Sequence, residues 1–135
     1  MQAATIAFAL FGFGRWIEDG GVADKATFDE DHMNFTGASG FTFHGLNGTL
    51  IVPLLSVAFL IVSFFVRSVR GGVTWAAIVF GLVALQVALG LLGHEIVALG
   101  PLHGINAFAL FMAALYAGRR AAPQVLTPQP SPTAM

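Results

Sequence analysis

The chain has 135 residues, of which 56% are hydrophobic and 10% are charged, and its formal net charge is −1. A soluble domain would carry about 25% charged residues, so the composition predicts an integral membrane protein. A chain so close to neutral has none of the basic surface that nucleic acid requires, so nucleic acid is excluded as a partner. The sequence contains no cysteine, which excludes disulfides, thiolate metal sites and cysteine nucleophiles.

Four apolar segments predict an all-α, antiparallel four-helix bundle within the membrane, occupying residues 1–120. The helices are expected at about residues 1–16, 44–67, 72–93 and 102–118. A spanning helix needs roughly 20 mostly apolar residues, and the first segment falls short of that length. We therefore expect the natural chain to begin upstream of Met1. Pro53 is expected to kink the second helix.

The connections predict the orientation of the bundle. Residues 17–41 hold six of the seven acidic residues and are expected to form an acidic outer loop that folds over the mouth of the bundle. Arginines follow the second and fourth helices, which places those ends, and with them both termini, in the cytoplasm. Residues 121–135 are rich in Pro, Ser and Thr, so we expect a disordered cytoplasmic tail.

One motif occurs twice in the chain. His44-Gly45-Leu46-Asn47-Gly48 and His103-Gly104-Ile105-Asn106-Ala107 lie 59 residues apart, each at the start of an apolar run. The repeat indicates two related helical hairpins with histidines in equivalent places near the outer surface. Paired imidazoles on paired membrane helices are suited to the axial ligation of haem.

The other residues of the motif predict how a cofactor would be accommodated. Gly48 and Ala107 lie one helical turn after each histidine and leave room for a planar ring on the same face. Asn47 and Asn106 are placed to form hydrogen bonds to a neighbouring helix. The alternative is purely structural, because His and Asn near a membrane interface also hold helices together.

Other polar residues predict an extended metal site and a second repeat. His94 and Glu95 follow the third helix and, with His44 and His103, could complete a zinc or copper site. Gln2 and Gln86 form a second, fainter repeat, and each must face the protein interior, where it packs between helices or binds a quinone carbonyl. We expect no catalytic residues and favour a protein that is not an enzyme, since no nucleophile–base pair, phosphate-binding loop or carboxylate dyad occurs in the sequence.

From Gln2 to Arg120, the chain resembles a family of small four-helix bacterial membrane proteins known only as a domain of unknown function. The resemblance rests on the histidine that opens the second helix, on Leu85-Gln86, and on Leu102-His103-Gly104-Ile105-Asn106. The chain is more distantly similar to one half of a heme A synthase, whose axial histidines lie on its second and fourth helices. That resemblance implies haem ligation by His44 and His103.

Two functions are therefore expected. In the first, the protein is haem-associated or redox-associated, binds haem b through His44 and His103, and passes electrons, with a quinone as a possible partner. In the second, it is a cofactor-free accessory subunit that packs against other subunits of a larger, respiratory-type membrane complex. Membrane lipid surrounds the helices in both.

Overall fold

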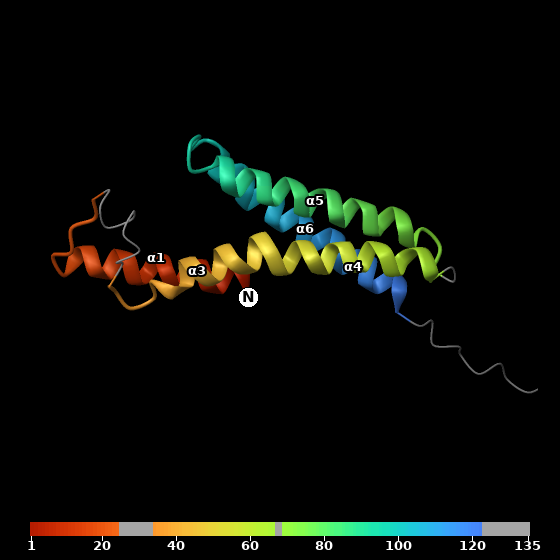
Figure 1. Ribbon diagram of the computed structural model, residues 1–135, viewed down its shortest axis with the longest axis horizontal. Coiled ribbons are helices and arrows are strands. Elements are labelled where there is room, and N and C mark those ends of the chain that lie inside the picture. Colours follow the sequence, from red (N-terminus) through yellow and green to blue (C-terminus); the bar gives the residue numbers. More distant parts are fainter. Residues whose placement is uncertain (25–33, 67–68, 123–135) are drawn as a thin grey trace, which may run out of the picture.

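The computed structural model describes residues 1–24, 34–66 and 69–122, and every regular element within these ranges is a helix (Figure 1). The helices are α1 (Gln2–Glu18), α3 (Ser39–Leu46), η1 (Asn47–Ile51), α4 (Val52–Phe65), α5 (Gly72–Leu92) and α6 (Leu99–Ala121). The predicted all-α class is confirmed for this part of the chain. The expected disordered tail after residue 122 and residues 25–33 of the acidic loop lie outside the described residues.

Three helical segments are long and apolar enough to cross a membrane, which is consistent with a multi-pass membrane protein. They are Ser39–Phe65, which joins α3, η1 and α4 into one segment of 27 residues, and the helices Gly72–Leu92 and Leu99–Ala121. At about 1.5 Å per residue, even the shortest matches the roughly 30 Å hydrocarbon core. Helix α1, expected at about residues 1–16 and shorter than a span, has 17 residues and ends on charged side chains.

The helices form two packed groups. Helices α4, α5 and α6 pack side by side, whereas α1 packs mainly against α3 (Figure 1). Contacts pair Gln2 with His44 and Gln86 with His103, so these four residues lie at one level of the molecule. From that level α5 continues for only six residues, but α1 continues for sixteen and projects about 15 Å further.

Small side chains fill the interior and large ones face outward. The buried apolar residues are Ala9, Ala76, Val79, Val83, Ala113 and Ala117. Most Phe, Leu and Ile side chains of α4, α5 and α6 are exposed on the outer faces. This distribution is typical of membrane helices, because lipid solvates large apolar groups while small residues let backbones approach closely.

Glycines bring α1 close to the start of α3. A Cβ atom on Gly40 would collide with the carbonyl oxygen of Thr5, and one on Gly37 would lie 2.6 Å from the carbonyl oxygen of Phe8. Gly37 also has φ +101°, a backbone conformation that favours glycine. Beyond this contact, the Phe35 ring packs against α1, with its centroid 5.7 Å from that of Trp16.

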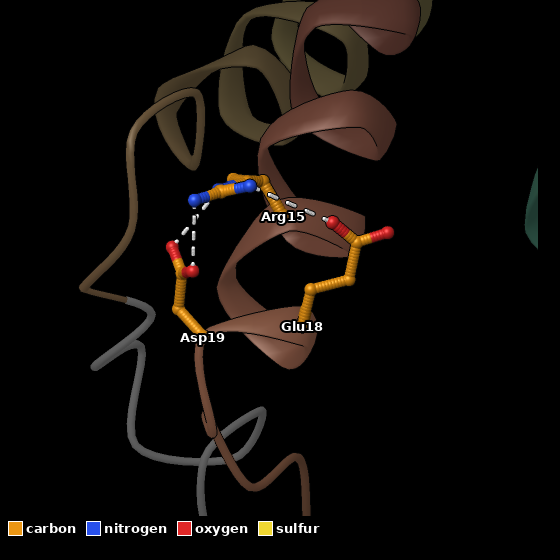
Figure 2. A network of polar contacts seen from close by, with 3 residues as sticks. All are labelled: Arg15, Glu18 and Asp19. Atoms are coloured by element: carbon orange, nitrogen blue, oxygen red, sulfur yellow. Dashed lines mark hydrogen bonds and ion pairs between the residues drawn. The ribbon is translucent and has the colours of Figure 1, made fainter.

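The far end of α1 carries a small charged cluster. The Arg15 guanidinium binds the Asp19 carboxylate through two contacts of 3.0 Å, and it lies 3.9 Å from the Glu18 carboxylate (Figure 2). These side chains are well exposed, so the pairs contribute little to stability. Their exposure is consistent with a helix end that lies in water.

A π-helical turn interrupts the segment 39–65. In the π-helix Asn47–Ile51, the amide of Val52 donates to the carbonyl of Asn47, five residues back. Pro53 follows at the second residue of α4, where it has no N–H to donate and its ring crowds the carbonyl of Thr49 in a regular helix. The sequence predicts a kink at Pro53, and the structure has a π-turn directly before this residue.

Candidate functional site

The two repeated histidines lie next to each other. The ring centroids of His44, on α3, and His103, on α6, are 6.2 Å apart, and their planes are inclined by 62°. Both residues are partly buried. Helices α3 and α6 have at most slight backbone contact, so the two imidazole rings bridge the space between them.

In the second half of the chain, a glutamine and a histidine pair reciprocally. The Nδ1 atom of His103 lies 3.1 Å from the carbonyl oxygen of Gln86, and Nε2 of Gln86 donates to the carbonyl oxygen of His103 at 3.0 Å. The ring also lies close to Gly90, where a Cβ atom would be 3.1 Å from its Cε1. A glycine at that position lets the histidine sit against α5.

The first half repeats the same pair. The Nδ1 atom of His44 lies 3.1 Å from the carbonyl oxygen of Gln2, and Nε2 of Gln2 donates to the carbonyl oxygen of His44 at 3.3 Å. The faint glutamine repeat in the sequence therefore corresponds to a structural repeat. The sequence pointed to the glutamine side chains, but not to their main-chain carbonyls, because every residue type carries that acceptor.

These contacts fix the tautomer of both rings. A carbonyl oxygen can only accept a hydrogen bond, so Nδ1 of each imidazole carries the proton. The neutral ring then keeps its lone pair on Nε2. Within the described part of the chain, neither Nε2 atom has a hydrogen-bond partner. A ring held by an Nδ1–H bond to a backbone carbonyl, with Nε2 available, is the arrangement typical of metal-ligating histidines.

The two asparagines behave differently. Asn106 is buried, and its Nδ2 donates to Oε1 of Gln86 at 2.6 Å and to the carbonyl oxygen of Leu82 at 2.9 Å. This is the predicted bond to a neighbouring helix. Asn47 forms no side-chain hydrogen bond with any described residue. No bond equivalent to that from Asn106 to Gln86 therefore forms in the first half, and Oε1 of Gln2 is buried without a partner among the described residues.

The small residues of the motif are also not equivalent. A Cβ atom on Gly48 would lie 2.8 Å from Nε2 of Gln2, so this glycine makes room for the glutamine rather than for a planar cofactor. Ala107 is exposed on α6. Open space instead adjoins Gly45 and Gly104, the residues directly after the two histidines, where an added Cβ would meet nothing within 4 Å.

The wider metal site that included His94 and Glu95 is not assembled. Within the described residues, which include all four proposed ligands, no three His, Asp or Glu side chains come close enough to hold one ion. His94 and Glu95 are exposed in the turn between α5 and α6. His32, the remaining histidine of the chain, lies outside the described residues.

The histidine pair fits the donor set of a bis-imidazole metal centre. With metal–nitrogen bonds of about 2.0 Å and about 1.1 Å from nitrogen to ring centre, two imidazoles that bind one metal from opposite sides have centroids about 6.2 Å apart. The observed separation is 6.2 Å. No family model matches the chain, and neither curated proteins nor solved structures give a match.

Proposed function

We propose that the chain is a multi-pass protein of the bacterial cytoplasmic membrane in which His44 and His103 hold one haem b between them. The observation that carries the proposal is the pair of rings at 6.2 Å, each with its Nδ1 proton bound to a backbone carbonyl. The two related hairpins would supply one axial ligand each. Bound haem would supply reversible one-electron transfer.

The surroundings of the rings support the proposal. An Nδ1–H bond to a carbonyl orients the ring and increases the basicity of Nε2, which strengthens a bond to iron. Gln86 would act on the site through His103, since its main-chain carbonyl accepts from the ring, and Asn106 would act through Gln86. A membrane quinone is a suitable electron partner because it dissolves in the lipid around these helices.

A visible spectrum tests the proposal. Detergent-solubilised protein, titrated with haemin and reduced with dithionite, should show a Soret band with a reduced-minus-oxidised change. The double variant His44→Ala/His103→Ala should lose this band, because both axial ligands are gone. His94→Ala is the matched control, since His94 is exposed and does not form a three-residue cluster with the pair. A wild-type protein that takes up no haem would refute haem binding, and a double variant that takes up as much would refute ligation by His44 and His103.

One observation favours the second candidate, an accessory subunit of a larger membrane complex. Helix α1 projects about 15 Å beyond the end of α5. Its outward-facing side chains include Phe8, Leu10 and Phe11, which are 53%, 54% and 81% exposed. An apolar surface beyond the three spans calls for cover from another subunit. In that case, the purified chain would be colourless and would gain stability with its partner.

A further inference from the structure

The two histidines of the pair are not held equally. We propose that His103 is the permanent ligand of the site and that His44 is the exchangeable one, so that an external small ligand binds on the side of His44. This inference rests on the proposed haem function, and it adds a binding position that the symmetric sequence repeat does not predict.

The hydrogen-bond chain behind His103 is closed. Asn106 donates to Oε1 of Gln86, and Gln86 in turn donates to the carbonyl oxygen of His103 while accepting from its ring. Asn106 is also anchored to the carbonyl oxygen of Leu82. The Gln86 amide has a partner at both Oε1 and Nε2, and together with the Nδ1 bond of the ring these contacts tie His103 and its segment of α6 to α5.

The corresponding chain behind His44 is open. Oε1 of Gln2 has no partner, and the bond from Gln2 to the carbonyl oxygen of His44 is longer than its counterpart, 3.3 Å against 3.0 Å. The carbonyl oxygen of Gln2 is also shared, because the Thr5 hydroxyl donates to it at 2.9 Å. Less hydrogen bonding therefore opposes a movement of His44.

The backbone shows the same difference. The π-helix begins at Asn47, three residues after His44, whereas residues 103–110 form regular α-helix within α6. A π-turn departs from the i→i−4 hydrogen bonding of the α-helix it interrupts, and such turns often occur at functional sites. The repeat also places Ile6 where Gly90 lies in the second half, so α1 offers no glycine for the His44 ring to lie against.

Exchange at His44 is a ligand substitution without electron transfer. If haem binds, Nε2 of His44 would be the ligand that gives way, and a neutral two-electron donor would take its place on the ferrous iron. Carbon monoxide is the probe, and dithionite supplies the electron that keeps the iron ferrous. The neutral imidazole is released with its Nδ1 proton in place, so no proton transfer is needed.

Single histidine variants test the inequality. We expect His103→Ala to lose haem to a scavenger such as apomyoglobin about tenfold faster than His44→Ala, because only His103 has the complete supporting shell. The carbon monoxide spectra of wild-type protein and His44→Ala should coincide, since His103 stays bound in both. Equal loss rates in the two variants, or a wild-type protein that binds no carbon monoxide, would overturn the inference.

The asparagines provide a matched pair of positioning variants. Asn106→Ala removes the partner of Gln86 and should speed haem loss about tenfold. Asn47→Ala should change the rate far less, because Asn47 makes no bond to Gln2. Equal effects of the two variants would contradict the difference between the hydrogen bonds behind His103 and those behind His44.

Hydrogen–deuterium exchange of the haem-free protein keeps the inference separate from the haem proposal. Amides at residues 48–52 should exchange faster than those at 107–111, since the first set lies in the π-turn. If wild-type protein takes up no haem, the haem proposal fails and the exchangeable ligand fails with it. If haem binds but the two segments exchange alike, only the inequality of the histidines fails.

Discussion

At the scale of single residues, the occupied ring nitrogen decides what each histidine can do. The bond from Nδ1 to a main-chain carbonyl leaves Nε2 as the free lone pair of both rings. The duplicated motif predicts that the rings come together, because equivalent positions of related hairpins lie at one depth. The motif does not predict which atoms accept hydrogen bonds from the two rings. Nor does it predict that the Asn47 side chain forms no hydrogen bond with a described residue, because both depend on local backbone geometry rather than on residue type.

The glutamines should differ in their contribution to stability. Gln86→Met removes one bond to His103 and one from Asn106, and should lower the free energy of unfolding by about 1 kcal/mol, at about 0.6 kcal/mol per bond. Gln2→Met removes one long bond and also an unpartnered buried oxygen, so its effect should be near zero or stabilising. Unfolding of the haem-free protein by SDS titration measures both, and a larger loss for Gln2→Met would contradict the assignment.

At the scale of elements, apolar runs predict where a helix lies in the sequence, but not which neighbouring helix it packs against. The third helix was expected at 72–93 and spans Gly72–Leu92, because an uninterrupted apolar run flanked by polar residues leaves little choice. The position of α1 could not be derived in this way. It depends on where Gly37 and Gly40 let two backbones approach, and a composition argument does not locate such contacts.

Two glycines of α3 should therefore respond in opposite ways to alanine. Gly40→Ala forces its Cβ against the backbone of Thr5, which cannot move aside as a side chain can, and should cost about 1–3 kcal/mol. Gly45→Ala, five residues later in the same helix, meets nothing within 4 Å and should stabilise the helix by about 0.5–1 kcal/mol. Thermal unfolding in detergent distinguishes them, and two equal shifts would show that α1 does not pack on α3 through Gly40.

At the scale of the whole molecule, the interior is too small to explain stability in water. The buried apolar residues are mostly alanine and valine, while large apolar side chains cover the outer faces of the three long segments. This surface suits lipid, which solvates it at no cost and leaves close packing and interhelical hydrogen bonds to hold the helices. The composition alone predicts this inside-out distribution, but it does not predict that α1 packs mainly on α3, at the start of the segment Ser39–Phe65, rather than alongside α4, α5 and α6.

Cysteine labelling tests the orientation of these segments, because the sequence has no cysteine of its own. Helix α5 is 21 residues long, about 32 Å, and its ends are marked by Arg70 and Glu95. If it spans the membrane, Glu95→Cys should react with a membrane-impermeant maleimide added outside intact cells, and Arg70→Cys should react only after lysis. Asp19→Cys should behave like Glu95→Cys, and Ala122→Cys like Arg70→Cys.

The arginine distribution gives the direction, since positive residues concentrate on the cytoplasmic side. Labelling of both ends of α5 from one side would show that it does not cross. The membrane topology would then be wrong, and His44 and His103 would not lie near the outer surface.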